Sequence, residues 1–193
     1  TGRVVDSLTN ILTVKLFADT ASIPGLLPLI DLPYIRGFTT NPTLMRKAGV
    51  RKYREFAKNA LIVIPANKPV SFEVFADSFT EMEEQAEEIA SWGKNVYVKI
   101  PVTTTSGDPT YSLISRHLRN DIKVNVTAVM TIEQVVILSG GILRGDTPSY
   151  VSIFAGRIAD TGRDPVPTMA AALELLHDTP QTELIWASPR ELL

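Results

Sequence analysis

Cysteine is absent from this 193-residue sequence. Without cysteine the chain can form no disulfide, thiol nucleophile or cysteine zinc site, and it gives no sign of secretion. No apolar run reaches the roughly 18 to 20 residues that a helix needs to cross a bilayer, and no signal peptide is visible at the start. These absences predict a cytoplasmic enzyme that does not bind a membrane.

A basic excess is also lacking. The chain has 19 Lys and Arg residues against 21 Asp and Glu residues, which leaves a formal net charge of -2. This balance does not suggest nucleic-acid binding. One basic cluster fits the solvated side of a helix, because no aromatic platform or second basic stripe joins it. Its members are Arg46, Lys47, Arg51, Lys52 and Arg54.

Histidine is scarce, with only His117 and His177 in the whole sequence. The two lie far apart in charged, helix-like segments, and no residue beside either offers the spacing of a metal ligand set. We therefore expect both to be solvated helix residues, and we predict no metal site.

Seven short apolar runs have the length and the Val, Ile, Phe and Tyr content of β-strands. Between most of them lie helix signals, including candidate N-terminal caps at Thr80, Thr131 and Asp164. Alternation of strand and helix predicts an α/β fold with a parallel sheet, either a closed (β/α)8 barrel or an open doubly wound sheet. The runs cover residues 14–20, 37–42, 70–76, 96–102, 124–130, 150–157 and 183–188.

Two observations favour the barrel. The chain has neither Gly-x-Gly-x-x-Gly after the first strand nor GxxxxGK[ST], the nucleotide-binding signatures of the open sheet. Four strands also have one aliphatic face and one face with polar residues among aromatics. An open doubly wound sheet would bury two apolar faces, whereas a barrel lumen can collect polar groups near its C-terminal mouth. The polar faces hold Ser71, Glu73, Phe75, Tyr97, Lys99, Asn125, Thr127, Ser152 and Phe154.

The strand count leaves the predicted barrel one strand short. Such barrels typically have about 200 to 400 residues, and this sequence has 193. A barrel of seven strands would have two open edges. We expect residues 1–193 to form a single barrel domain whose eighth strand is missing, with a C-terminal segment missing or disordered.

Lys99 lies in the middle of the run VYVKIPV, where desolvation of an ammonium group is costly. Two interpretations are open. The lysine can be structural, either snorkelling at a strand end or paired with a buried carboxylate such as Glu73. Alternatively, burial keeps part of it as the free amine that attacks a carbonyl carbon.

Asp19 and Glu73 stand at the ends of two other predicted strands. Each carboxylate alone is compatible with a helix N-cap or a salt bridge. Acid–base catalysis, however, needs groups that pass protons to a substrate held between them. Asp19, Glu73 and Lys99 project from the first, third and fourth strands, so together they form a candidate catalytic trio in the lumen.

Arg157 and Arg190 follow the sixth and seventh predicted strands. Barrels often build a phosphate site from loops late in the chain, and a guanidinium group binds phosphate with two parallel hydrogen bonds. Ser152 and Ser188 could donate hydrogen bonds beside the arginines. The alternative is that both arginines pair with acidic residues close to them in the sequence.

Seven motifs occur in order, one for each predicted strand: FADT, GFTTNPTL, SFEVFAD, YVKIPVT, NVTAV, SIFAGRIAD and ASPREL. In this order they resemble the transaldolase family, over roughly residues 14–193. TTNP followed by the VKIP lysine is specific, whereas each motif alone is weak. The resemblance implies the (β/α)8 fold, a Schiff base on the lysine of the fourth strand, and no metal or organic cofactor.

The resemblance also implies a role for each matching residue. Lys99 matches the Schiff-base lysine, and Asp19 matches the aspartate that shuttles the hydroxyl proton in carbon–carbon cleavage. Glu73 matches the glutamate that acts through a water near the lysine, and Thr127 helps to hold that water. The matching substrate-binding residues are Asn41 and Ser152 for the donor, and Arg157, Ser188 and Arg190 for the phosphate.

Two related activities share this pattern. Transaldolases move a dihydroxyacetone unit from a ketose phosphate to an aldose phosphate, whereas the similar fructose-6-phosphate aldolases release dihydroxyacetone. Those aldolases typically have glutamine at the position of Glu73 and tyrosine at that of Met130, so this sequence favours transfer. ASPRE stands in place of the more familiar ASFR around the phosphate site. This difference leaves open which acceptor is used, and whether the enzyme serves the pentose-phosphate pathway or biosynthetic sugar assembly.

Two other classes of protein remain as alternatives. A non-catalytic sugar-phosphate-binding barrel would keep the arginines without needing the catalytic trio, and a structural protein could receive its eighth strand from another chain. The expected partners are sugar phosphate substrates and further copies of the same chain, because family members commonly form oligomers. No nucleic-acid or membrane partner is expected.

Overall fold

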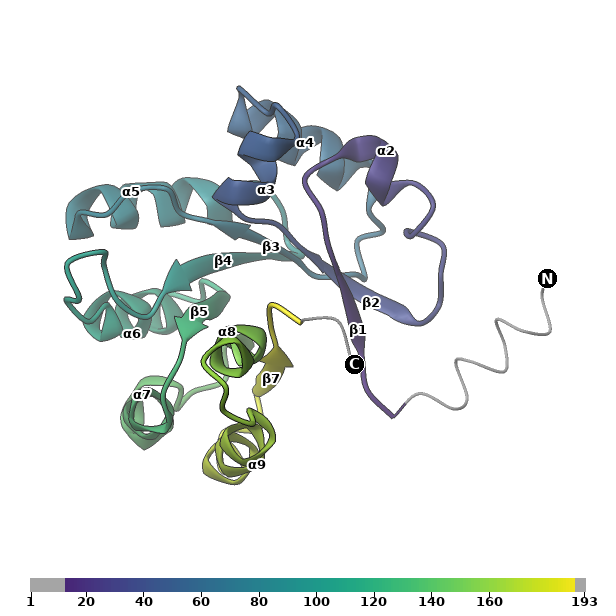
Figure 1. The fold of residues 1–193 in the computed structure, drawn as a ribbon. Coiled ribbons are helices and arrows are strands. Elements are labelled where there is room, and N and C mark those ends of the chain that lie inside the picture. The colour runs from purple at the N-terminus through teal and green to yellow at the C-terminus, as the bar shows by residue number, and fades with distance from the viewer. Residues whose placement is uncertain (1–12, 190–193) are drawn as a thin grey trace. The chain divides into compact units, whose positions relative to one another are not determined.

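The computed structural model describes residues 13–189 (Figure 1). The chain divides into two compact units, one drawn from residues 1–75 and 88–97 and the other from residues 76–87 and 98–193. Helix α5 (Phe79–Ala90) and strand β4 (Val96–Pro101) contribute residues to both units.

The first unit holds strands β1 to β3, which pair in parallel, β1 with β2 and β2 with β3. The register places Asp19 beside Thr39, and Thr39 beside Ser71. Because successive side chains of a strand point to opposite faces, these residues share one face, and Glu73 joins them two residues further along. The elements are β1 (Leu16–Asp19), α2 (Ile23–Leu26), β2 (Ile35–Thr39), α3 (Pro42–Lys47), α4 (Tyr53–Val63) and β3 (Val70–Glu73).

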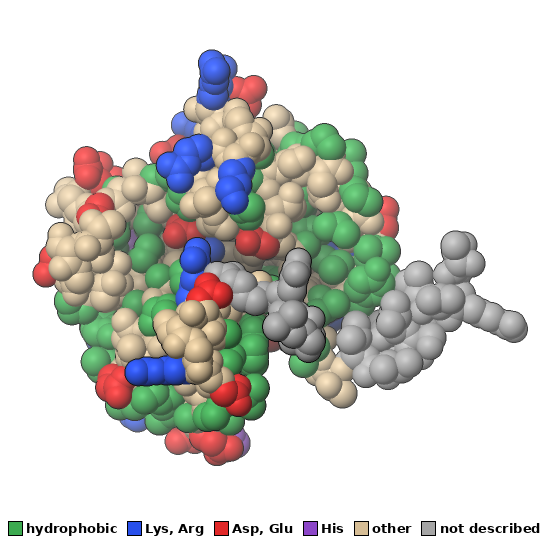
Figure 2. Space-filling view, in the orientation of Figure 1, with side chains coloured by type: hydrophobic (Ala, Val, Ile, Leu, Met, Phe, Trp, Pro, Cys, Tyr) green, Lys and Arg blue, Asp and Glu red, His purple; other side chains and the backbone are tan. Residues whose placement is uncertain are grey.

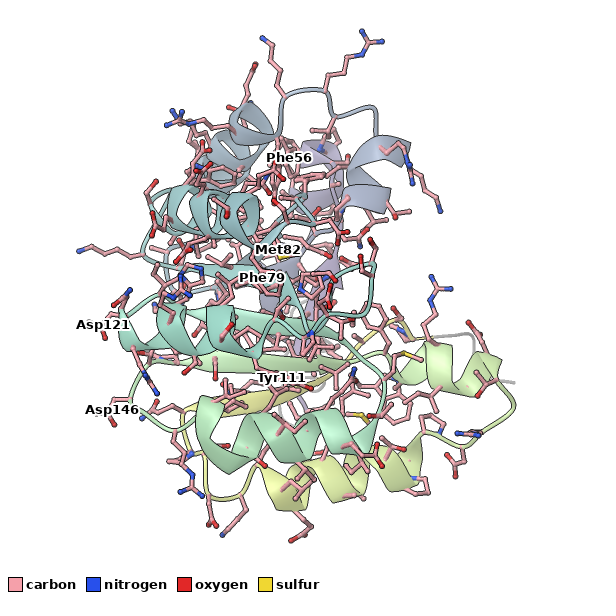
Figure 3. All side chains as sticks on the ribbon, turned by 90° about the vertical axis from the view of Figure 1, so that its left-hand side faces the viewer. Phe56, Phe79, Met82, Tyr111, Asp121 and Asp146 are labelled. Carbon is pink, nitrogen blue, oxygen red and sulfur yellow. The ribbon has the colours of Figure 1, made fainter. Side chains whose placement is uncertain are left out.

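The opposite face of this sheet is apolar and lies under helix α4. Phe38, Val70 and Phe72 are almost fully buried. Together with Phe56 and Ala60 of α4 they line one small internal gap, and Phe56 is labelled among the packed side chains in Figure 3. Helix α2 packs against α4. Thr20, Thr39 and Thr40 also border this gap.

The second unit holds strands β4 to β7, which pair in parallel in sequence order. Helix α6 packs against β5, α7 packs against α9, and α9 packs against β7. Most residues of β5 and β6 are buried, with Val124, Val126, Val151 and Ile153 fully so. The remaining elements are α6 (Tyr111–Arg119), β5 (Val124–Val129), α7 (Ile132–Ile137), the π-turn η1 (Leu138–Ile142), β6 (Ser149–Ile153), α8 (Ala155–Asp160), α9 (Val166–Leu175) and β7 (Thr182–Trp186).

One of the three predicted helix caps is confirmed, since Thr131 forms the expected capping box with Gln134. At α9 the N-cap position falls to Pro165, and the Asp164 carboxylate, one residue earlier, accepts a hydrogen bond from the Val166 amide. The predicted cap at Thr80 is wrong. Helix α5 begins at Phe79, and the Ser78 hydroxyl, 3.4 Å from the Glu81 amide nitrogen, takes the capping position.

The strand order confirms the predicted fold class. Within residues 13–189 the sheet has seven strands in sequence order, and every described pair is parallel. A doubly wound sheet reverses its strand order at a switch point, and no such reversal occurs. The α/β fold with seven parallel strands is therefore consistent with a (β/α)8 barrel that lacks one strand. The single-domain organisation stays a prediction.

The basic cluster and the two histidines differ in their exposure to solvent. All five members of the basic cluster are exposed, as predicted, and Figure 2 shows blue side chains over α3 and α4. His177 is exposed, but His117 is only 1% exposed, so the prediction of a solvated histidine there is wrong. No helix within residues 13–189 is both long and apolar enough to span a bilayer.

Candidate active site

Lys99 is buried in the middle of β4, with 8% of its surface exposed. Its neighbours in the strand, Val98 and Ile100, are fully buried on the opposite face. The register with β5 places Asn125 directly beside Lys99. Lys99 thus shares the polar face of the strand pair with Asn125 and is largely shielded from solvent.

Asn125 was not among the site residues predicted from the sequence, yet the structure places it in this group. It is completely buried, and its Oδ1 accepts a hydrogen bond from the Ser152 hydroxyl at 2.7 Å. Ser152, a predicted donor-binding residue, is 2% exposed. The signal was present in the alternation of NVTAV, but only the register shows that Asn125 stands beside Lys99.

Thr127 follows on the same face of β5 and is completely buried. Its hydroxyl oxygen makes no hydrogen bond within the described residues. The next residue, Ala128, has a positive φ of 58°, at a register shift between Val126 and Val129. Such backbone is unfavourable for a residue with a Cβ, and strain of this kind gathers at functional sites. A buried hydroxyl available to a water or a substrate is consistent with the predicted role of Thr127.

The predicted phosphate-binding residues lie at the ends of β6 and β7. Arg157 is exposed in α8, and Ser188 is half-buried with a positive φ of 53°. The segments that carry them are joined, because the Gly156 amide donates to the Ala187 carbonyl at 3.4 Å and the Ala187 amide donates to the Ile153 carbonyl at 2.8 Å. Arg190 lies outside the described residues.

Asp19 ends β1 in the first unit, where two side chains donate hydrogen bonds to its carboxylate. The Thr39 hydroxyl donates to Oδ1 at 3.0 Å, and the Asn41 side-chain amide is 3.4 Å from Oδ2. The carboxylate is exposed to solvent and oriented by neighbours on β2 and just after it. Thr39 was not predicted from the sequence, because its relation to Asp19 depends on the pairing of β1 with β2.

Asn41 has a second contact that fixes its amide group. It is the N-cap of α3, and its Oδ1 accepts a hydrogen bond from the Leu44 amide at 2.9 Å. With Oδ1 used by the helix, the NH2 group points to Asp19. The TTNP motif therefore has a local structural reason: asparagine caps the helix that Pro42 opens at its first position.

Glu73 is the last residue of β3 and is half-buried. Its carbonyl oxygen accepts a hydrogen bond from the Tyr53 hydroxyl at 2.8 Å. Beyond Glu73 the strand alternation ends, since Phe75 packs edge-to-face on Tyr53, the same ring that Phe72 contacts. The predicted placement of Phe75 on the polar face with Glu73 is therefore wrong, because both phenylalanines pack on the α4 side.

The arrangement supplies two kinds of chemistry, one in each unit. In the second unit a buried amine lies beside amide and hydroxyl groups that could hold the oxygens of a carbonyl compound. In the first unit an oriented carboxylate could accept and return a proton. The convergence of these groups on one substrate stays a prediction. Among the described residues no group of three or more His, Asp or Glu side chains could hold a metal ion.

Comparison with known proteins points to one family. The family model described as Transaldolase/Fructose-6-phosphate aldolase matches residues 16–193. The chain is 34% identical over 151 residues to a probable transaldolase of Dehalococcoides mccartyi, covering 78% of this chain and 65% of that protein, somewhat less than two thirds. It is 34% identical over 180 residues to a probable transaldolase of Streptococcus pyogenes serotype M2, covering 92% of this chain and 78% of the relative.

The family match spans the strands that carry the candidate residues, from Asp19 on β1 to Ser188 after β7. Buried polar groups at Lys99, Asn125 and Thr127 lie in the middle of that match. From these findings, the chain belongs to the transaldolase/fructose-6-phosphate aldolase family.

Proposed function

We propose that this chain is a transaldolase-type class I aldolase that transfers a dihydroxyacetone unit from a ketose phosphate to an aldose acceptor. The observation that carries the proposal is the burial of Lys99 in β4, beside Asn125. A lysine buried in the middle of a strand, beside groups that can bind a carbonyl compound, is the expected nucleophile of a Schiff-base enzyme. Membership of the family supports the same chemistry.

Lys99 would act first. Its amine attacks the ketone carbon of the donor, and the resulting carbinolamine loses water to form an imine. Asn125 and Ser152, which are joined by a hydrogen bond, would bind donor hydroxyl groups beside that imine. The protonated imine then accepts the electrons released when the C3–C4 bond breaks, so the protein itself provides the electron sink.

Asp19 would accept and return the proton that moves during carbon–carbon bond cleavage. Its carboxylate takes the proton of the donor C4 hydroxyl, the C3–C4 bond breaks, and the first aldehyde leaves. The enamine on Lys99 adds to a second aldehyde, and Asp19 returns the proton to the new hydroxyl. The hydrogen bonds from Thr39 and Asn41 would keep one carboxylate oxygen lone pair aimed at the substrate during both steps.

Glu73 and Thr127 would serve the steps that lose and add water. We assign Glu73 as the group that moves a proton through a water molecule, with the buried Thr127 hydroxyl as one of that water's hydrogen-bond partners. Hydrolysis of the second imine by the same water route frees the product ketose and restores the Lys99 amine. Arg157, Ser188 and Arg190 would bind the substrate phosphate.

The proposal favours transfer over release because of Glu73 and Met130. The similar aldolases that release dihydroxyacetone typically have glutamine and tyrosine at these positions. A screen that pairs fructose 6-phosphate with different aldose phosphates, and measures free dihydroxyacetone against new ketose, separates the two activities. Dihydroxyacetone formed at the same rate with and without acceptor would assign the chain to the releasing class.

Covalent trapping tests the role of Lys99. Borohydride added with fructose 6-phosphate should reduce the imine and attach the donor to Lys99, as read by mass spectrometry of peptides. Lys99→Ala should lose both label and turnover, whereas the exposed Lys94→Ala variant should keep both. A Lys99→Ala protein that labels and turns over like the parent would refute the proposal, and binding without label would favour the non-catalytic barrel.

We also propose that the chain assembles with further copies of itself. Support comes from the second unit, where α7 and α9 pack together and leave Val136, Ile137, Val166 and Leu173 exposed. Large apolar side chains exposed on neighbouring helices are a feature of many protein interfaces. Light scattering should give a solution mass above the 21.2 kDa of one chain; a mass of one chain at assay concentration contradicts assembly. The cytoplasmic location stays a prediction.

A further inference from the structure

Tyr53, the first residue of α4, reaches the end of the strand that carries Glu73. Its hydroxyl donates a hydrogen bond to the Glu73 carbonyl oxygen at 2.8 Å. Tyr53 is twenty residues away in sequence and belongs to none of the motifs that identify the family. It therefore has a contact with a proposed catalytic residue that the proposed function does not yet use.

The backbone ladder explains why a side chain is needed at this carbonyl. Along β2 and just beyond it, the Phe38 amide donates to the Pro69 carbonyl and the Thr40 amide donates to the Ser71 carbonyl. In a parallel ladder the next donor of the series would come two residues later, at position 42, opposite Glu73. Position 42 is proline, which has no amide hydrogen. The Tyr53 hydroxyl therefore donates to the Glu73 carbonyl in place of the missing backbone amide.

An aromatic cluster holds the Tyr53 ring in place. Its centroid lies 4.5 Å from that of Phe75, 5.2 Å from that of Trp92 and 6.2 Å from that of Phe72, and all three contacts are edge-to-face. Such pairs add about 0.5–1.5 kcal/mol each beyond the area they bury. A ring fixed on three sides leaves its hydroxyl with little freedom, so the hydrogen bond to Glu73 has a defined direction.

Tyr53 keeps its proton throughout the working range of an enzyme. Burial raises the pKa of its hydroxyl far above the usual value, and the nearby negative charge of Glu73 raises it further. The hydroxyl is thus a permanent donor, and its effect on the strand end does not change with pH.

We propose that Tyr53 is a positioning residue that fixes the backbone at Glu73 and so aims the Glu73 carboxylate. The inference rests on the proposed role of Glu73 in proton transfer. The direction of the Cα–Cβ bond follows from the backbone torsions on either side, and a carbonyl pinned at the strand end restricts them. Loss of the hydrogen bond from Tyr53 widens the range of positions of the Glu73 carboxylate. A smaller fraction of these positions then allows proton transfer.

Tyr53→Phe removes the hydroxyl and retains the ring, so it is the direct test. We expect kcat for transfer to fall roughly five-fold, as for loss of one hydrogen bond. KM for fructose 6-phosphate should stay within about two-fold of the parent, because the Tyr53 hydroxyl donates to a backbone carbonyl and not to a proposed substrate-binding side chain. Tyr34→Phe is the matched control, since it removes a tyrosine hydroxyl of the same unit outside this aromatic cluster. It should leave kcat unchanged even if it lowers the unfolding temperature.

A double-mutant cycle with Glu73→Gln distinguishes positioning from general support of the fold. If Tyr53 acts through the Glu73 carboxylate, Tyr53→Phe should cause no further loss of kcat in the Glu73→Gln protein. The full five-fold loss in that background would overturn the inference, as would an unchanged kcat in the single variant. If Tyr53→Phe is unstable, the same cycle is measured below its unfolding transition.

Borohydride trapping separates this inference from the proposed function. A parent protein that forms no label on Lys99 defeats the proposed function and the inference with it. A parent that labels normally, together with a Tyr53→Phe variant of unchanged kcat, defeats the inference alone.

Discussion

Gly37 leaves the space in which the Phe17 ring lies against β2, and substitution of this glycine should disturb β1. A Cβ added at Gly37 would lie 2.4 Å from Cε1, 2.8 Å from Cδ1 and 2.9 Å from Cζ of Phe17. Carbon atoms pack at about 3.5–4.0 Å. The ring would therefore have to move by about 1 Å or more, and it is a rigid group rather than the end of a flexible chain.

The expected magnitude is a balance of two effects. Overpacking of this kind costs about 1–3 kcal/mol, and replacement of glycine in a strand by alanine regains about 0.5–1 kcal/mol through the backbone. We therefore expect Gly37→Ala to lower the free energy of unfolding by roughly 1–2 kcal/mol, or about 2–8 °C in the unfolding temperature of a chain of this length.

The same variant should also reduce activity. Phe17 lies two residues before Asp19, and Gly37 lies two residues before Thr39, so the two pairs are consecutive steps of one ladder. Displacement of Phe17 would lengthen the 3.0 Å hydrogen bond between Thr39 and Asp19. We expect a lower kcat for transfer, because the carboxylate proposed to move the proton loses its orientation.

Thermal unfolding and steady-state kinetics check this prediction together. Gly140→Ala is the matched control, because a Cβ there meets no atom within 4 Å. It should be neutral or more stable by up to about 1 kcal/mol. Phe17→Leu in the Gly37→Ala protein should restore part of the stability, since the smaller side chain relieves the overlap. Wild-type stability in Gly37→Ala, or equal losses in both glycine variants, would refute the reasoning.

Two further predictions concern single side chains. Thr39→Val removes a donor to Asp19 and should lower kcat roughly five-fold with little change in KM; the exposed Thr43→Val variant should match the parent, and an unaltered kcat in Thr39→Val would count against the orienting role. Burial lowers the pKa of His117, so the folded state favours its neutral form, and stability should fall as the pH drops below about 6.5. Urea midpoints between pH 7 and 5 should decline less in His117→Gln than in the parent, and parallel declines would show that other groups are responsible.

The positions of the strands could be predicted because they depend on local pattern. All seven predicted strands are found among the described residues, since runs of Val, Ile and Phe with period two suit a pleated, buried surface. Their ends were less predictable. The run at 150–157 includes Ala155 to Arg157, which form the start of α8, because apolar composition alone does not separate a strand end from a helix start.

The errors share a cause, namely that burial and cap choice depend on neighbours distant from the residue itself. His117 was expected in solvent because its segment is charged, yet α6 turns that position inward. The sequence predicted a cap at Thr80, but α5 begins at Phe79 and the Ser78 hydroxyl takes the capping position. The alternation of side chains along the strand predicted Phe75 on the same face as Glu73. The structure ends β3 at Glu73, and the Phe75 ring packs on Tyr53.

The sequence by itself determined the candidate reactive groups of this protein. A lysine in an apolar strand, carboxylates at two strand ends and the order of seven motifs were enough to indicate the family and to select Lys99. The tertiary structure alone decided which groups support them. Asn125 beside Lys99, Thr39 on Asp19 and Tyr53 on Glu73 are contacts between elements well separated along the chain. Such contacts depend on strand register and helix docking, which no local pattern of residues specifies.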